Sequence, residues 1–162
     1  PYESDLTHGF VLHEDGLKMS KSSANIVSPD EIINKSGADI LRLWVASSDY
    51  SEDLKIGPEI MKSNVDSYRR LRNTLRFILG NLSEFNDNEK ISYAELSELD
   101  QYILSQLEEL KKEVIENYKI FEYQKVFSAI FNFCTNDLSS FYFDIKKDIL
   151  YCESKNLSLI HI

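Results

Sequence analysis

The sequence predicts a mainly α-helical fold with one short strand near its start. Three long stretches repeat apolar residues every three or four positions, which places those residues on one face of a helix. Ser28-Pro29 and Gly57-Pro58 are typical helix starts, because proline fits the first helical position. Apolar residues make up 43% of the 162 positions, which is enough to bury a compact core.

The segment before the first helix start is predicted to hold a strand, a turn and a loop. Residues 8–12 form the strand, and Asp15-Gly16 favours a tight reversal over 13–16. Residues 17–27 are rich in serine and lack an apolar period, which predicts a loop. The strand has lost its sheet, so we expect about the first 25 residues to be mobile and the helices after Pro58 to be the stable unit.

Two short helices should follow. Ser28 caps the first helix, which ends at Gly37, and Asp39 caps the second. Trp44 lies on the apolar second helix, so we expect it in the core. Residues 47–57 are polar and close with Gly57-Pro58, another helix start.

The remaining chain predicts a helix bundle. Helices are expected over 58–82, 95–118 and 122–143, with a polar linker over 81–92. Short connections favour antiparallel packing of these helices. The aromatic residues between 121 and 143 follow helical spacing, so we expect them in the core rather than on an RNA-stacking surface. The apolar stripe of the first long helix comprises Met61, Val65, Tyr68, Leu71, Leu75, Ile78, Leu79 and Leu82.

The charge distribution leaves room for one basic surface. A net charge of −9 argues against a generally basic nucleic-acid-binding protein, yet residues 55–76 hold six basic and two acidic side chains. Four of the basic residues fall near one helix face and form a candidate surface for RNA phosphates. The alternative is a solvated face whose charges pair with Glu59 and Asp66. The four residues are Lys62, Arg69, Arg72 and Arg76.

Cys134 and Cys152 predict reduced thiols rather than a metal site, because no CxxC pair or neighbouring histidine accompanies them. No apolar run reaches the roughly 18 residues of a membrane-spanning helix, and no signal peptide is recognisable. We therefore expect a cytoplasmic protein without a membrane partner and without a bound metal in this chain. Pro1 stands where an initiator methionine would be, so the sequence is expected to begin inside a longer protein.

The segment Lys18-Met19-Ser20-Lys21-Ser22 carries the clearest chemical signal. Two lysines three residues apart on a flexible loop can converge on a polyphosphate, because each ammonium group is a point charge on a long stem. The serine hydroxyls add hydrogen-bond donors. Such a loop can stabilise charge that develops on a departing pyrophosphate. On composition alone, a solvated basic loop is the simpler explanation.

This pentapeptide resembles the KMSKS motif of class I aminoacyl-tRNA synthetases, and we call residues 18–22 the KMSKS loop. The residues on either side of it, 7–11 and 37–44, are similar to those of the isoleucine, valine and leucine members. The segments 66–77 and 132–148 resemble the isoleucine members in particular. The resemblance covers about residues 1–157, and its separate matches occur in the family's order.

The resemblance implies three regions. Residues 1–57 would hold the end of the catalytic domain, with the KMSKS loop and the stem-contact helices. Residues 58–157 would form part of the helical anticodon-binding domain. Residues 158–162 do not continue the family pattern, so we expect them to be a tail of foreign sequence.

The resemblance also implies ATP-dependent activation of isoleucine and its transfer to tRNA(Ile) by a monomeric full-length enzyme, with this segment inactive alone. ATP, accompanied by Mg²⁺, would contact Lys21 and Lys18 through its phosphates. Met19 would lie beside the nucleotide, and Ser20 and Ser22 would support the loop. The basic residues Lys62, Arg69, Arg72 and Arg76 would contact tRNA. Zinc would belong only to a region C-terminal to this chain.

Some alternatives stay open at this stage. Ala24-Asn25 stands where the family often has Gly-Asn, and alanine is less favourable than glycine wherever φ must be positive. The amino-acid pocket lies outside the sequence, so the valine and leucine enzymes remain alternatives. A stand-alone helical module that binds tRNA or a protein, and retains a vestigial loop, is a third interpretation.

Overall fold

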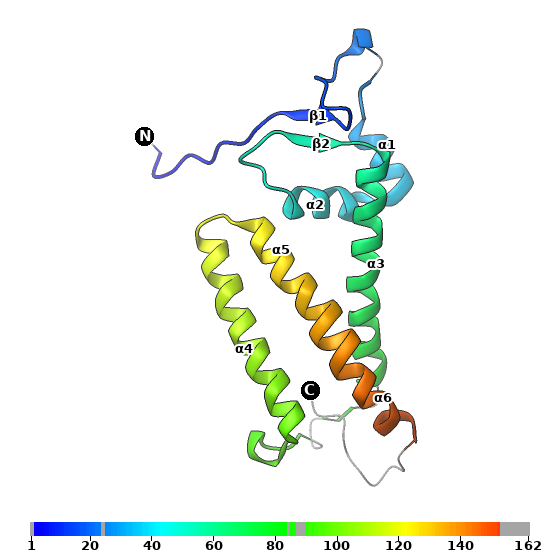
Figure 1. Cartoon of the computed structure of the whole chain (residues 1–162), viewed down its shortest axis with the longest axis vertical. Coiled ribbons are helices and arrows are strands. Elements are labelled where there is room, and N and C mark those ends of the chain that lie inside the picture. Colours follow the sequence, from blue (N-terminus) through cyan, green and yellow to red (C-terminus); the bar gives the residue numbers. More distant parts are fainter. Residues whose placement is uncertain (1, 24, 84, 87–89, 153–162) are drawn as a thin grey trace.

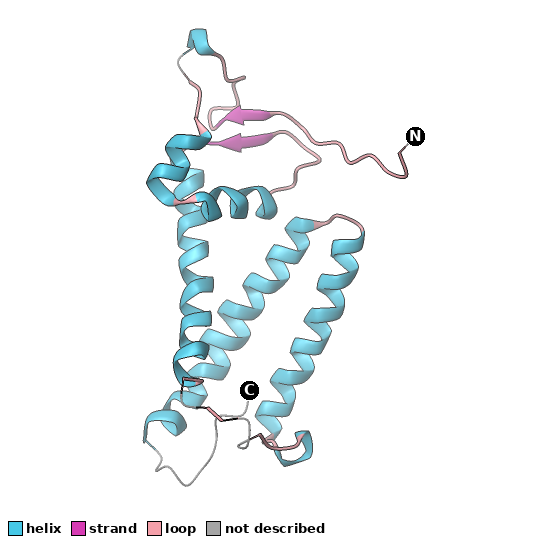
Figure 2. Ribbon diagram, turned by 180° about the vertical axis from the view of Figure 1, so that it is seen from behind, coloured by secondary structure: helices cyan, strands magenta, loops and turns pink. Residues whose placement is uncertain are grey.

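The computed structural model describes residues 2–23, 25–83, 85–86 and 90–152, except for the side chains of 148–152. A small sheet and two short helices form one end of the molecule, and long helices form the rest (Figure 1). The view from behind shows the N-terminal segment extending away from the sheet (Figure 2). The residues predicted to be a foreign tail, 158–162, lie outside the described part.

The sheet has two parallel strands, β1 (Val11–His13) and β2 (Leu54–Ile56), with Val11 opposite Leu54. The strand predicted over 8–12 is therefore shorter and shifted by about three residues at its start. The expectation that this strand has no sheet is wrong, because it pairs with β2, which lies in the polar segment 47–57. A strand of three residues is too short to produce a recognisable alternation in the sequence.

Two helices lie between the strands in the chain, α1 (Pro29–Ser36) and α2 (Ala38–Ser47). The Ser28 hydroxyl caps α1 as predicted, by accepting a hydrogen bond from a backbone N–H in the first turn at 3.3 Å. Gly37, at φ +91°, ends α1 and directly precedes α2. The predicted cap at Asp39 is therefore wrong, since the N-cap is Gly37, two residues earlier, and α2 starts at Ala38.

A first hydrophobic core joins these short elements to the next helix. Trp44 is only 5% exposed, which confirms its predicted place in this core. The members come from α1, α2, β2 and the start of the first long helix, so the core ties all four elements together. The buried members are Ile32, Trp44, Ile56 and Met61.

The long helices are α3 (Pro58–Asn81), α4 (Glu98–Lys119), α5 (Tyr123–Asn132) and α6 (Phe143–Cys152). The first two confirm the predicted helices. The helix predicted over 122–143 is longer than expected, because α5 runs through a π-helical segment, η4 (Phe133–Tyr142), into α6.

A second hydrophobic core lies between α3, α4 and η4. It includes Phe143, whose ring centroid is 4.6 Å from that of Phe77 on α3. The aromatic residues of 121–143 are thus only partly core as predicted, because Phe121 and Phe141 are 40% and 42% exposed. The buried members are Ile103, Phe133, Leu138, Tyr142 and Phe143.

The buried face of α3 differs from the predicted apolar stripe at one turn. Leu75 and Leu79 are exposed at 56% and 69%, whereas Thr74 is 2% exposed. The Thr74 hydroxyl lies 2.8 Å from the Ser139 hydroxyl and donates to the Cys134 carbonyl at 3.3 Å. Its small side chain lets α3 approach η4 closely, and its hydroxyl bonds a carbonyl of the irregular helix.

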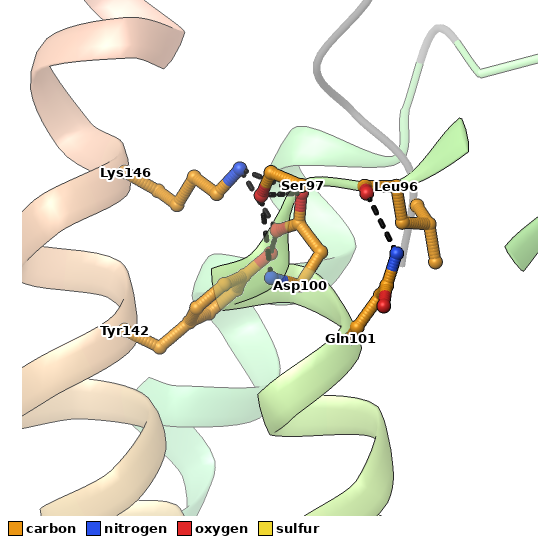
Figure 3. A network of polar contacts seen from close by, with 6 residues as sticks. All are labelled: Leu96, Ser97, Asp100, Gln101, Tyr142 and Lys146. Carbon is orange, nitrogen blue, oxygen red and sulfur yellow. Dashed lines mark hydrogen bonds and ion pairs between the residues drawn. The ribbon is translucent and has the colours of Figure 1, made fainter. Parts of the chain in front are cut away.

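A buried polar network holds the start of α4 against η4 and α6 (Figure 3). Asp100, 7% exposed, accepts a hydrogen bond from the Tyr142 hydroxyl at 2.6 Å and pairs with the Lys146 ammonium at 2.8 Å. The Ser97 hydroxyl donates to the same carboxylate at 2.6 Å. Lys146 is 4% exposed, so both charges depend on each other for compensation.

The first prediction concerns this network. Asp100→Asn should lower the free energy of unfolding of the chain by about 3–5 kcal/mol, because it leaves the Lys146 charge buried without its partner. Urea denaturation measures this loss. Asp144→Asn is the control, since Asp144 pairs with Lys147 on an exposed surface and its loss should cost less than about 1 kcal/mol. Equal effects of the two substitutions would contradict the role of Asp100.

The same network predicts a pH dependence. Burial raises the pKa of Asp100, but the hydrogen bonds from Lys146, Ser97 and Tyr142 outweigh burial and leave that pKa below its ordinary value of 3.8. The ionised form therefore stabilises the fold above pH 3.8, and this contribution is lost as the pH falls further. Asp100→Asn should remove this part of the acid sensitivity.

Candidate functional site

The KMSKS loop extends from the strand pair on a tight turn. Gly16, at φ +79°, donates its N–H to the His13 carbonyl at 2.8 Å, which confirms the predicted reversal. The His13 N–H then donates to the Leu17 carbonyl at 2.9 Å, so the chain that leaves the turn runs back beside β1. The loop thus begins from a fixed base rather than from a flexible tether.

Asn25 braces the loop across its base. Its side-chain oxygen accepts a hydrogen bond from the Ser20 N–H at 3.0 Å, and its side-chain nitrogen donates to the Lys18 carbonyl at 3.3 Å. One amide side chain therefore bonds the backbone on both sides of Met19. Ala24, where the sequence departs from the family pattern, lies outside the described residues.

The serines fold the tip of the loop into one turn of 3₁₀ helix over Lys21–Ser23. The Ser20 hydroxyl lies 2.7 Å from that of Ser23 and 3.1 Å from that of Ser22. These contacts fix the backbone on which Lys21 stands. Each hydroxyl keeps further hydrogen-bonding capacity, since a hydroxyl can both donate and accept.

The KMSKS loop is anchored to the protein at Met19 and open to solvent at Lys18 and Lys21. Met19 packs against the first hydrophobic core, whereas Lys18 and Lys21 are exposed. Within the described residues, neither lysine forms an ion pair with a carboxylate. An ammonium group without a carboxylate partner is free to bind an incoming anion, and two of them flanking the anchor suit a polyphosphate.

The four predicted basic residues of α3 are all exposed and lie on one side of the helix, within about a quarter of a turn at 3.6 residues per turn. Lys62 pairs weakly with Glu59 at 3.9 Å, and Arg69 with Asp66 at 3.5 Å. Arg72 and Arg76 have no ion pair in the described part of the chain. The expected pairing with acids therefore accounts for two of the four charges and leaves the other two available.

Other site types find little support in the described residues. Among them, no three histidine, cysteine, aspartate or glutamate side chains gather as metal ligands. Cys134 is buried as a free thiol, and burial raises its pKa. None of the helices in the described part is both long and apolar enough to cross a membrane.

Comparison with known families matches both ends of the chain. Residues 1–57 match the family model for class I tRNA synthetases of the I, L, M and V type. Residues 100–161 match the model for the anticodon-binding domain of tRNA ligases. The chain belongs to the class I tRNA synthetases.

Relatives of this synthetase chain align along almost its whole length. The isoleucine–tRNA ligase of Ruegeria pomeroyi is 55% identical over 94% of the chain, and that of Petrotoga mobilis is 53% identical over 98%. The alignments cover 16% and 17% of those two relatives. The chain therefore spans about a sixth of the length of the curated relatives that it matches.

A solved structure supports the same fold. A LeuRS of Agrobacterium radiobacter K84, crystallised in a ternary complex with tRNA and LeuAMS, aligns with a TM-score of 0.69. The alignment covers 79% of this synthetase chain and 16% of the LeuRS chain, at 21% identity. At that identity the likeness concerns the fold alone.

The sequence indicates both candidate surfaces of this synthetase chain, the KMSKS loop and the basic face of α3. It does not indicate that Asn25 braces the loop. The pentapeptide identified the loop, and helical spacing identified the basic face. Asn25 was noted only as part of a departure from the family pattern. A lone asparagine seven residues after Lys18 gives no local signal in the sequence, because its two hydrogen bonds form only when the folded loop brings Asn25 beside Ser20 and Lys18.

The second prediction tests Asn25 as a brace. Asn25→Ala should speed the hydrogen exchange of the Ser20 amide, because that N–H loses its acceptor. Asn25→Asp is the matched control, since it retains an acceptor oxygen and loses only the donor to Lys18. Residue-resolved hydrogen exchange measures both variants, and unchanged Ser20 exchange in Asn25→Ala would show that the brace does not form.

Proposed function

We propose that this chain is the part of an isoleucine–tRNA ligase that carries the KMSKS loop and the first helices that bind tRNA. The full-length enzyme would activate isoleucine with ATP and transfer it to tRNA(Ile). The observation that carries the proposal is the 53–55% identity to isoleucine–tRNA ligases along nearly the whole chain. The same similarity favours isoleucine over valine or leucine.

The two parts of the chain, which carry the KMSKS loop and the basic face of α3, would have different roles. Residues 1–57 would close the catalytic domain, and residues 58–157 would contribute the anticodon-binding bundle. Both surfaces belong to one continuous segment joined by α3, so ATP and tRNA would be held by a single piece of chain. An enzyme that charges tRNA works where tRNA is, which supports a cytoplasmic location, and we expect it to act as a monomer.

The loop residues would act on the phosphates of ATP. Lys21 and Lys18 would bind them as point charges, and the Ser20 and Ser22 hydroxyls would donate hydrogen bonds. Charge on the departing pyrophosphate increases in the transition state, so a lysine held in place stabilises that state more than the ground state. Met19 would anchor the loop through its packing on the core.

The residues of the loop fit ATP better than a protein-bound metal. Lysine and serine side chains suit phosphate oxygens, and the loop contains no carboxylate to hold Mg²⁺. Mg²⁺ would therefore reach the site on the nucleotide, where it supplies charge compensation for the phosphates.

The third prediction tests Lys21. Lys21→Ala in the full-length ligase should lower isoleucine-dependent ATP–pyrophosphate exchange about a hundredfold, the usual effect of losing one donor to a developing charge. Lys18→Ala should lower it in the same direction. Lys35→Ala is the control, because Lys35 is an exposed lysine of α1 outside the loop. Full exchange activity in Lys21→Ala would contradict the role of the loop.

The α3 face would bind the tRNA backbone. Phosphate contacts by arginine give an attraction that is independent of sequence and weakens with salt. Arg72 and Arg76 are the strongest candidates, because no carboxylate of the described residues pairs with them. Lys62 and Arg69 would join them once their weak surface pairs open.

The fourth prediction concerns salt dependence. Arg72→Ala and Arg76→Ala in the full-length ligase should each reduce the slope of log tRNA affinity against log salt concentration by about one. Arg70→Ala is the control, because this exposed arginine lies on another side of the same helix. Filter binding over a salt series measures the slopes. An equal change in all three variants would point to general electrostatics instead of a defined face.

A further inference from the structure

The turn between α4 and α5 contacts the end of the molecule that carries the sheet. The Tyr50 hydroxyl donates a hydrogen bond to the Phe121 carbonyl, 71 residues away in the chain. The rings of Tyr50 and Tyr123 lie 5.9 Å apart, and those of Tyr118 and Tyr123 lie 5.6 Å apart. In Figure 1 this turn lies directly below the loop that joins α2 to β2. We call these four residues the aromatic clasp.

The clasp contains a phenylalanine where a helix end usually has glycine. The Phe121 N–H donates to the Tyr118 carbonyl at 3.2 Å, and the Glu122 N–H donates to the Asn117 carbonyl at 2.9 Å. This pair of bonds is the Schellman motif, whose left-handed position glycine normally occupies. Phe121 has φ +63°, and no other non-glycine residue of the described chain has a positive φ.

Such a position is strained for a side chain, so something other than local stability favours phenylalanine there. The Phe121 ring lies 6.4 Å from the Tyr123 ring, which glycine could not contact in this way. The Phe121 carbonyl accepts the bond from Tyr50. The strained residue therefore supports the contact between the α4–α5 turn and the loop that joins α2 to β2.

Tyr50 is itself fixed to the strand pair. Its carbonyl accepts a hydrogen bond from the Gly9 N–H at 2.9 Å, two residues before β1. The Asp49 carboxylate accepts bonds from the Ser51 N–H at 3.1 Å and its hydroxyl at 2.6 Å, which holds the turn around Tyr50. A Cβ at Gly9 would overlap the Glu52 carbonyl, so these segments are in direct contact. A continuous path therefore runs from the clasp through β1 to the KMSKS loop.

We propose that the aromatic clasp, together with the packing of α2 against α5, forms an attachment beside α3 that fixes the helix bundle relative to the KMSKS loop and so positions bound tRNA for aminoacylation. This proposal rests on the proposed ligase function. α3 alone is a rod of about 36 Å for its 24 residues, and small rotations at its base would displace its far end widely. A contact away from the α3 axis prevents those rotations. Tyr50 is a positioning residue here, because it acts through the packing of the bundle.

The fifth prediction tests the clasp by Tyr50→Phe in the full-length ligase, which removes the hydroxyl and keeps the ring. Its kcat/KM for tRNA in aminoacylation should fall about 3- to 10-fold, the factor that one hydrogen bond usually contributes, while ATP–pyrophosphate exchange without tRNA stays within about twofold. Tyr118→Phe is the matched control, since its ring belongs to the clasp and its hydroxyl makes no hydrogen bond to a described residue. It should change neither activity.

Two activity results would overturn the proposal. One is an unchanged kcat/KM for tRNA in Tyr50→Phe, and the other is an equal loss of exchange and aminoacylation, which would indicate a general defect. Hydrogen exchange gives a readout independent of activity: the amides of 118–123 should exchange faster in Tyr50→Phe, and unchanged rates would also overturn it. A wild-type protein without isoleucine-dependent exchange would contradict the proposed function instead, and hydrogen exchange would then decide on the clasp.

Discussion

α3 contributes to both hydrophobic cores, and the arrangement of the chain depends on this sharing. Its first turns bury Met61 against the sheet and the two short helices, while Phe77 and Ile78 near its end pack on the bundle core. A helix whose interior bonds are complete bends little over such a length. The loop that would face ATP and the helix face that would contact tRNA are therefore joined through α3, although each core is small.

Polar contacts fix how the helices lie against one another, where apolar packing alone would allow them to slide. The Asp100–Lys146 pair joins the start of α4 to α6, and Thr74 joins α3 to η4. The bond from Tyr50 to the α4–α5 turn acts at the opposite end of the bundle. Apolar cores tolerate sliding between surfaces of similar shape, whereas a buried charge or hydroxyl stabilises only the arrangement that satisfies it. Their positions at both ends of the bundle would suit the proposed role of presenting tRNA in one orientation.

Much of the fold and of the candidate site can be predicted from the sequence. The same physical reasons explain which predictions are wrong. Helical periodicity is a local property, so α3 and α4 were expected within a few residues. Thr74 was not expected in place of Leu75 on the buried face, because its burial depends on a hydroxyl partner 65 residues away. β2 escapes prediction because it is only three residues long. Asn25 escapes prediction because its contacts form only in the folded loop. The KMSKS loop is recognisable from its composition and its resemblance to the family, whereas the brace at Asn25 is evident only in the folded structure.

The central claim is that one rigid segment holds the phosphates of ATP at the KMSKS loop and the tRNA backbone at the basic face of α3. A structure of the full-length ligase with tRNA(Ile) and a non-hydrolysable ATP analogue tests it most directly. The account predicts the Lys21 ammonium within hydrogen-bond distance of a phosphate oxygen, and Arg72 and Arg76 against the tRNA backbone. A loop turned away from the nucleotide, or a basic face covered by another part of the protein, would contradict it.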